Sequence, residues 1–179
     1  FFKDKDGNVI PNYPTEEGKQ PKKDIPGYRY VKSNPLPNGD VEHVYEKVTT
    51  FFKDKDGNDI KPKESGSVDK KDIPEYRFVE TKKLPNGDVE HVYEKVTTFF
   101  KDKDGNDIKP KESGAVDKKD IPEYRFVETK KLPNGDTEHV YEKVKTFFKD
   151  KDGNVIPNVP SEEGVTPKKD IPGYRFVET

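Results

Sequence analysis

The octet FFKDKDGN constrains the fold more than any other feature of this sequence, because it occurs four times. The copies begin at Phe1, Phe51, Phe99 and Phe147. An interval of 48 to 50 residues that recurs in this way is the signature of a tandem array. The two inner copies of the repeat differ only at Ser67 against Ala115, Val89 against Thr137 and Thr97 against Lys145. We therefore expect a series of small domains of nearly the same structure.

The octets predict four repeats with boundaries at 1–50, 51–98, 99–146 and 147–179. The first and last are of a longer type, and their additional residues lie in a Pro- and Gly-rich connection, where insertions disturb a fold least. The last repeat is truncated, since it lacks the stretch that reads KKLPNGDVEHVYEKV in the second repeat. We expect the chain to be a fragment of a longer protein, whose folding units can be out of phase with these boundaries.

Turn and strand signals alternate within each repeat. In the second repeat, Gly57 and Gly87 lie in DGN and PNGD sequences, which are typical of tight hairpin turns because Gly and Asn accept positive φ. The runs VTTFFK, YRFVET and VEHVYEKV are rich in β-branched and aromatic residues, which favours strands. Pro62 and Pro74 are expected to interrupt strand pairing, because proline has no N–H to donate. The sequence predicts a mostly β fold, an elongated array of small sheets that are β-grasp-like or have three to four strands each.

The connection between repeats contains no linker signal. The segment HVYEKVTTFFKDKDG, residues 91–105, has neither Gly nor Pro before its final turn. We expect one long strand there, or two strands joined at Thr97-Thr98. Since only 28% of the residues are hydrophobic, each repeat has few side chains for a core of its own. Neighbouring repeats of the same chain are therefore expected to share an apolar junction and to form a stiff rod.

Charge and composition exclude several classes of partner. The 34 basic and 36 acidic residues leave a net charge of −2, and the two signs are mixed locally. This distribution predicts no binding to nucleic acid or to anionic membranes. No apolar run approaches the ~20 residues that a membrane helix requires, so no membrane insertion is expected in this segment. The absence of cysteine excludes disulfides and thiolate metal sites.

The Asp-x-Asp-Gly sequence of the octet invites comparison with a calcium-binding loop. An EF-type loop places oxygen ligands at alternate positions, followed by a Gly and a closing Glu. With Asp54 and Asp56 as the first ligands, Gly57 comes too early, and the closing acidic residue is missing. We interpret the sequence as a hairpin turn, and we expect no metal and no cofactor.

The remaining candidates for chemistry are histidines and carboxylates. Each complete repeat has one histidine: His43, His91 and His139. Each lies beside Val in a predicted strand with no second His nearby, which favours a half-exposed position over a metal site shared between copies. The carboxylates lie among lysines, and the sequence has no nucleophile elbow, phosphate-binding loop or Cys/His pair. We expect no catalytic site, because nearly interchangeable repeats provide length or multivalency, whereas an enzyme needs one specialised cleft.

Two further features remain open from sequence alone. An isopeptide bond between Lys and Asn or Asp needs a buried cluster that a sequence does not display. Tyr76, Phe78 and Tyr93 are candidates for stacking on sugars or partner peptides. Because apolar residues are few, most of these aromatic residues are expected in the core.

The stretches TTFFKDKDGNDI, DIPEYRFVET and NGDVEHVYEKV resemble the mucin-binding-type repeat of Gram-positive surface proteins. The matching residues of the second repeat are Asp54, Asp56, Gly57, Ile73, Pro74, Tyr76, Val92 and Tyr93. Gly27 and Gly173 complete the Ile-Pro-Gly-Tyr motif in the outer repeats, whereas the inner repeats have Glu75 and Glu123 instead. The chain is most similar to short repeats of streptococcal cell-wall-anchored proteins.

This resemblance implies a small β-grasp-like or three- to four-stranded unit in an extracellular, wall-anchored protein whose signal peptide and anchor lie outside this fragment. The function expected is that of stalk or spacer repeats, which project the distal binding domain of an adhesin. The alternative is a multivalent adhesive module that binds mucin glycans or host matrix proteins. A third hypothesis is a disordered segment that folds on a host partner.

Overall fold

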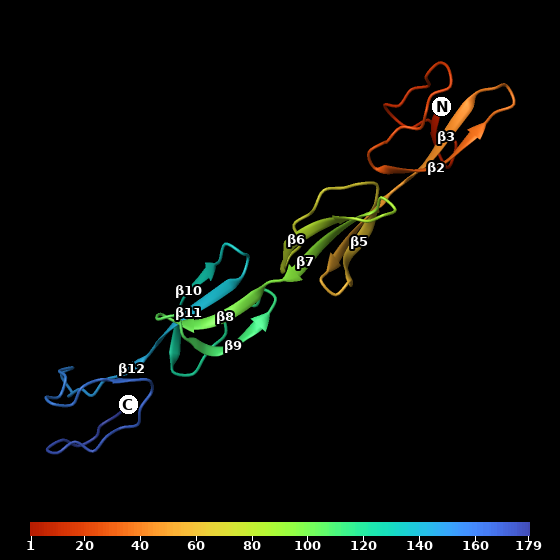
Figure 1. Cartoon of the computed structure of the whole chain (residues 1–179). Helices are drawn as coiled ribbons and strands as arrows, with labels where there is room; N and C mark the ends of the chain where they lie inside the picture. The colour runs from red at the N-terminus through yellow and green to blue at the C-terminus, as the bar shows by residue number, and fades with distance from the viewer. The chain divides into compact units, whose positions relative to one another are not determined.

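The computed structural model describes residues 1–179 and consists of strands and loops without a helix (Figure 1). It therefore has no helix that is long and apolar enough to cross a membrane. The chain divides into two compact units, Phe1–Lys95 and Val96–Thr179. The predicted fold class is confirmed, since both units are built from repeated small sheets, and the complete sheets have three or four strands.

The first unit contains two sheets. The first sheet has the strand order β1-β3-β2 and consists of β1 (Phe2–Asp4), β2 (Tyr28–Pro35) and β3 (Val41–Lys47). The second sheet has the order β5-β4-β7-β6 and consists of β4 (Thr49–Asp54), β5 (Asp59–Ser65), β6 (Tyr76–Lys83) and β7 (Val89–Lys95). In each sheet the first strand of the repeat lies parallel beside its last strand.

The centre of the second sheet is the parallel pair β4 and β7, in which Thr50 lies opposite Val89 and Asp54 lies opposite Tyr93. Strands β5 and β6 pair antiparallel with β4 and β7 and form the two edges. Parallel neighbours require a crossover. Here β5, the irregular segment 66–75 and β6 together provide it.

The core lies between the central strands and the irregular segment 66–75. Phe52 and Tyr93 are fully buried. The Tyr93 hydroxyl donates a hydrogen bond to the Lys71 carbonyl oxygen at 2.7 Å and accepts one from the Lys71 N–H at 3.0 Å. A buried aromatic ring and its polar end therefore act together, since the ring fills the core while the hydroxyl fixes the covering segment.

Both hairpin turns predicted in the second repeat are confirmed. At the first, the Asp54 N–H donates to the Asn58 carbonyl oxygen at 2.9 Å and closes the β4–β5 connection. At the second, the Leu84 N–H donates to the Asp88 carbonyl oxygen at 2.8 Å, between β6 and β7. Gly87 has a φ of 91° in this turn, a conformation that L side chains rarely adopt.

The second unit repeats the four-stranded sheet in the order β10-β11-β8-β9. Its strands are β8 (Thr97–Asp102), β9 (Asp107–Ser113), β10 (Tyr124–Lys131) and β11 (Thr137–Lys143). A short antiparallel pair follows, consisting of β12 (Lys145–Thr146) and β13 (Glu162–Glu163). The repeated architecture therefore follows the repetition of the sequence.

Pro62 interrupts strand pairing as expected, because the register of β5 against β4 passes from Glu64 to Lys61 at a bulge and leaves Pro62 without a partner. Strand β5 itself nevertheless continues through Pro62, because it is an edge strand, where proline is tolerated. One local prediction was wrong in detail. The break in the segment 91–105 falls at Val96, since β7 ends at Lys95 and β8 begins at Thr97, instead of at Thr97-Thr98.

Candidate functional site: the junction between consecutive repeats

The Asp54 carboxylate of the Asp-x-Asp-Gly sequence forms hydrogen bonds within the turn itself. Asp54 Oδ1 accepts hydrogen bonds from the N–H groups of Asp56 and Asn58, each at 2.9 Å. Its Oδ2 accepts from the Asn58 side-chain amide at 3.1 Å. The Asn58 donors, followed by the Asp56 N–H, lower the pKa of the Asp54 carboxyl group. No group of three or more His, Cys, Asp or Glu side chains in residues 1–179 is placed to hold a metal ion.

The histidines do not occupy the half-exposed positions that the sequence suggested. His91 is only 3% exposed, and its ring lies 5.5 Å from the Phe52 ring, measured between centroids. Its Nε2 lies 2.8 Å from the Val68 carbonyl oxygen, and its Nδ1 lies 2.8 Å from Thr81 Oγ1. Since a carbonyl oxygen only accepts, Nε2 carries the proton in this arrangement. The imidazole is therefore a buried core group whose two nitrogens are both satisfied.

The aromatic residues that were candidates for ligand stacking mostly pack within the repeat. Tyr93 is buried, while Tyr76 and Phe78 are half-buried. The Phe78 ring lies 5.7 Å from the Tyr93 ring in an edge-to-face arrangement. Lys70 Nζ lies 4.2 Å from the centre of the Phe78 ring. These aromatic residues therefore contribute mostly to the core, and Lys70 covers part of the half-buried Phe78 ring.

The most distinctive arrangement lies where one repeat meets the next within the first unit. A single residue, Val48, separates β3 from β4. Its N–H donates to the Gly27 carbonyl oxygen of the first repeat at 3.0 Å, and its carbonyl oxygen accepts from the Gly66 N–H of the second repeat at 2.6 Å. Both backbone groups of the connecting residue are thus bonded, one to each repeat.

The side chain of Val48 forms the apolar part of this junction. It is 3% exposed. A Cβ atom added at Gly87 would lie 3.2 Å from Val48 Cγ1, so the β6–β7 turn of the second repeat approaches this side chain closely. The expectation that neighbouring repeats share apolar contact is confirmed for this junction.

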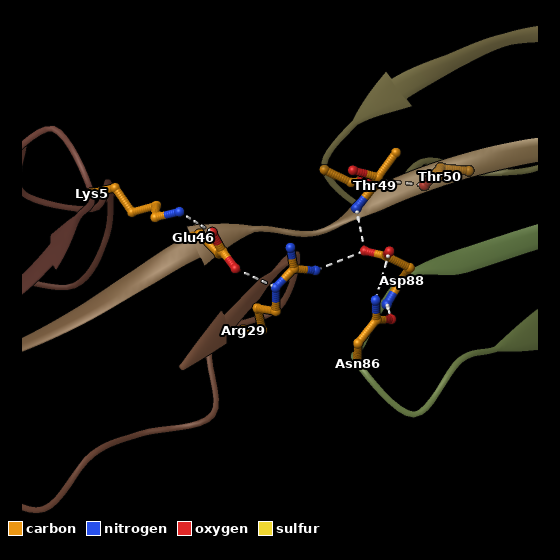
Figure 2. Close-up of polar contacts among 8 residues, drawn as sticks. Lys5, Arg29, Glu46, Thr49, Thr50, Asn86 and Asp88 are labelled. Atoms are coloured by element: carbon orange, nitrogen blue, oxygen red, sulfur yellow. Dashed lines mark hydrogen bonds and ion pairs between the residues drawn. The ribbon is translucent and has the colours of Figure 1, made fainter. Parts of the chain in front are cut away.

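Polar contacts complete the junction (Figure 2). Asp88 Oδ1 accepts from the Thr49 N–H at 2.8 Å and from Arg29 Nη1 at 2.9 Å. Asn86 holds the same carboxylate from the other side, since its Nδ2 donates to Asp88 Oδ2 at 3.0 Å. The Asp88 side chain is 11% exposed, so these bonds are largely shielded from water. The turn of the second repeat is therefore joined to Arg29 of the first repeat.

A second carboxylate holds the other side of the guanidinium group. Arg29 Nε donates to Glu46 Oε1 at 2.6 Å, and Lys5 Nζ lies 2.6 Å from Glu46 Oε2. Figure 2 shows Arg29 between Glu46 and Asp88. The bond to Glu46 already orients the Arg29 guanidinium group. Less conformational freedom is therefore lost when this group also binds Asp88.

The electrostatic consequences follow from these bonds. The Thr49 N–H is the largest influence on Asp88, and together with Asn86 and Arg29 it lowers the pKa of this carboxyl group. Lys5, and after it Arg29, lowers the pKa of Glu46. Glu46, and after it Asp88, raises the pKa of the Arg29 guanidinium group. All three groups are therefore held in their charged forms at neutral pH.

The second unit contains the same elements. The Val144 N–H donates to the Glu123 carbonyl oxygen at 2.9 Å, and its carbonyl oxygen accepts from the Gly164 N–H at 2.7 Å. Asp136 repeats one of the bonds of Asp88, since its Oδ1 accepts from the Thr97 N–H at 2.8 Å. The backbone pattern of the junction is thus a property of the repeat.

The pair Arg29 and Asp88 is missing from the sequence-based expectations, because PNGD is interpreted there only as a turn. A usable signal was present, since Asp recurs after each complete PNG turn and Arg follows the tyrosine of each Ile-Pro-x-Tyr motif. These two residues are 59 positions apart, so their contact depends on how two separate repeats pack.

Comparison with known families also shows a tandem array. The family described as the SSSPR-51 domain matches the chain three times in succession, over residues 1–47, 48–95 and 96–143. These matches confirm the tandem repeats. The second and third matched segments begin at Val48 and Val96, slightly before the octets at Phe51 and Phe99. No curated protein matches the chain.

Proposed function

Because the chain belongs to the SSSPR-51 domain family, we propose that its repeats are a structural spacer that holds a distal binding domain away from a bacterial cell surface. In this proposal the role is non-catalytic and the location is extracellular, on the wall of a Gram-positive bacterium. The resemblance to mucin-binding-type repeats and to streptococcal surface-protein repeats supports the proposed location.

One observation supports the spacer role more than any other. A single buried residue, Val48, connects two sheets, and both of its backbone groups are hydrogen-bonded. A flexible linker would instead contain exposed Gly, Ser or Pro residues with a free backbone. The charged pair of Arg29 and Asp88 adds a side-chain connection across the same junction. A spacer needs such fixed junctions, because freely hinged repeats would not hold a distal domain at a defined distance.

Small-angle scattering on chains of different repeat number tests the spacer proposal. Deletion of 48–95 removes one whole family segment, and duplication of 48–95 adds one. We expect the maximum dimension to change by an equal increment for each repeat. A maximum dimension that barely responds to the number of repeats would contradict the proposal.

The second candidate function is multivalent adhesion to mucin glycans or host matrix proteins. The observation that favours it is an open groove of about 520 Å³ in the third repeat, lined by both apolar and polar residues that include Val116, Lys118, Thr129 and Thr137. Grooves of this size accommodate small ligands. Binding of the full chain to a glycan or matrix-protein array, with avidity that rises with repeat number, would favour adhesion over a purely structural role.

A further inference from the structure

The Ile-Pro-x-Tyr motif forms a tight turn that requires positive φ at its third position. In the first repeat the Tyr28 N–H donates to the Ile25 carbonyl oxygen at 3.0 Å, and Gly27 between them has a φ of 82°. Proline followed by a residue with positive φ is the pattern of a type II turn, in which Gly is the expected residue. The outer repeats follow this rule.

The inner repeats have a glutamate in the position of that glycine. Glu123 has a φ of 71° within the same turn, which the Tyr124 N–H closes on the Ile121 carbonyl oxygen at 3.0 Å. Glu75 has a φ of 69°. Residues other than Gly are held in such conformations at a cost, and this occurs where the surrounding structure compensates. We therefore expect the Glu123 side chain to make contacts that compensate for its strained backbone conformation.

The carboxylate of Glu123 reaches into the following repeat. Its Oε1 accepts a hydrogen bond from the Val165 N–H at 3.1 Å. It also lies directly over Gly164, where an added Cβ atom would be only 3.0 Å from Oε1. Together with the Val144 N–H on the Glu123 carbonyl oxygen, one residue thus bonds to two backbone groups beyond its own sheet.

The first repeat provides the matched comparison. Ser67 occupies the position of Val165, and a Cβ atom added at Gly27 would lie 3.7 Å from the Ser67 nitrogen, an ordinary contact distance. Gly66 occupies the position of Gly164, and nothing lies within 4 Å of the Cβ atom that would be added there. The space for an acidic side chain therefore exists at this junction, but Gly27 has no side chain to fill it.

We propose that the third residue of the Ile-Pro-x-Tyr turn sets how firmly a repeat is coupled to the next one. Glutamate at this position couples the two repeats, because its carboxylate accepts a hydrogen bond from the backbone N–H that follows the glycine of the next repeat. We call this hydrogen bond the latch. Glycine leaves the same junction without a latch. This inference rests on the proposed spacer function, and it assigns to residues 27 and 123 the role of positioning residues for the junction.

Amide hydrogen exchange in the full chain tests the latch at the atom it binds. In Glu123→Gly, which restores the residue of the outer repeats, we expect the Val165 amide to exchange about two- to tenfold faster, the effect of losing one hydrogen bond. The reciprocal variant Gly27→Glu is expected to slow exchange of the Ser67 amide by a similar factor. Two variants with opposite expected effects separate a latch from a general change in stability.

Gly173→Glu is the matched control, because Gly173 lies in the same turn with a φ of 83° and nothing lies within 4 Å of the position of an added Cβ atom. This control introduces the strained glutamate without a latch, so exchange at Ser67 and Val165 should be unaffected. Unchanged exchange at Val165 in Glu123→Gly, or at Ser67 in Gly27→Glu, would overturn the latch. Either result would leave the scattering test of the spacer function intact, so the two proposals fail separately.

Discussion

At the scale of single residues, the Asp88 side chain takes part both in the β6–β7 turn and in the junction between the first two repeats. It closes its own turn with Asn86, and it accepts hydrogen bonds from Thr49 and Arg29 at the junction. Asp40 is the equivalent residue of the first repeat and makes the same bonds with Asn38. Comparison of Asp88 with Asp40 therefore separates the contribution of the junction from that of the turn.

We expect Asp88→Ala to lower the free energy of unfolding by about 1–3 kcal/mol, because it leaves the Thr49 N–H and Arg29 without their acceptor. Asp40→Ala removes only turn bonds and should cost less. Urea-induced unfolding followed by circular dichroism measures both values. Equal losses in the two variants would show that the junction bonds add no stability.

The lowered pKa of Asp88 predicts how this contribution depends on pH. A carboxyl group whose pKa is lower in the folded state stabilises the fold above its unfolded pKa of about 4. This contribution is lost as the pH falls through the lower, folded value. The difference in unfolding free energy between the wild type and Asp88→Asn should therefore be constant from pH 7 to about 5 and shrink below about 4. A difference that grows on acidification would contradict this assignment.

At the scale of elements, the irregular segment 66–75 is held over its sheet by side chains of the central strands, among them the Tyr93 hydroxyl group. The Tyr93 hydroxyl bonds to both backbone groups of Lys71, and equivalent tyrosines bond to Lys23 and Lys119. The segment itself contains Gly66 and Pro74 and forms no strand. Besides this tether, two further side chains hold its place over the sheet: His91 bonds to the Val68 carbonyl oxygen, and the Thr50 hydroxyl bonds to the Gly66 carbonyl oxygen and the Val68 N–H.

We expect Tyr93→Phe to lower stability by about 1–3 kcal/mol, because two backbone groups of Lys71 lose their partner while the aromatic ring remains. Amide exchange at Lys71 and proteolysis within 66–75 should both become faster. Tyr30→Phe is the control, because its hydroxyl bonds only to the exposed side chain of Ser33. Unchanged proteolysis in Tyr93→Phe would mean that the tether is dispensable.

Elements that depend on local chemistry were predictable, and those that depend on distant partners were not. The turn at Asp54 was predicted because Asp, Gly and Asn satisfy it within a few residues. The burial of His91 was missed because its partners, Thr81 and Val68, are 10 and 23 residues away. Strand β5 was missed because the signal of Pro62 is local, whereas its position at a sheet edge is not.

At the scale of the whole molecule, the tandem repetition was the easiest feature to predict from the sequence, and the contacts at the junction between repeats were the hardest. The octet predicted a tandem array, and three successive matches to one family confirm it. An apolar junction was expected because each repeat has few hydrophobic residues, and Val48 confirms it in the first unit. The pairing of Arg29 with Asp88 was missed, because Arg29 also pairs with Glu46 and Asp88 also pairs with Asn86 within their own repeats.

Insertion of Gly-Gly-Ser between Lys47 and Val48 is expected to uncouple the first two repeats. Because the chain has no cysteine, spin labels attach only to introduced ones, and Lys32 and Lys63 are exposed sites in the two repeats. Pulsed electron spin resonance should give a narrow distribution of distances between them in the wild type and a broad one after insertion. The same insertion between Glu17 and Gly18, in an exposed loop, is the control and should leave the distribution narrow. A distribution that is already broad in the wild type would contradict a fixed junction.

The parallel pairing of β4 with β7 has a mechanical consequence. When the chain is stretched from both ends, tension enters the repeat at the start of β4 and leaves it at the end of β7. Because the two strands run in the same direction over the pairs from Thr50 and Val89 to Asp54 and Tyr93, their hydrogen bonds are sheared together instead of being peeled apart one by one. A repeat of this kind is therefore built to resist extension along the direction of its own central strands.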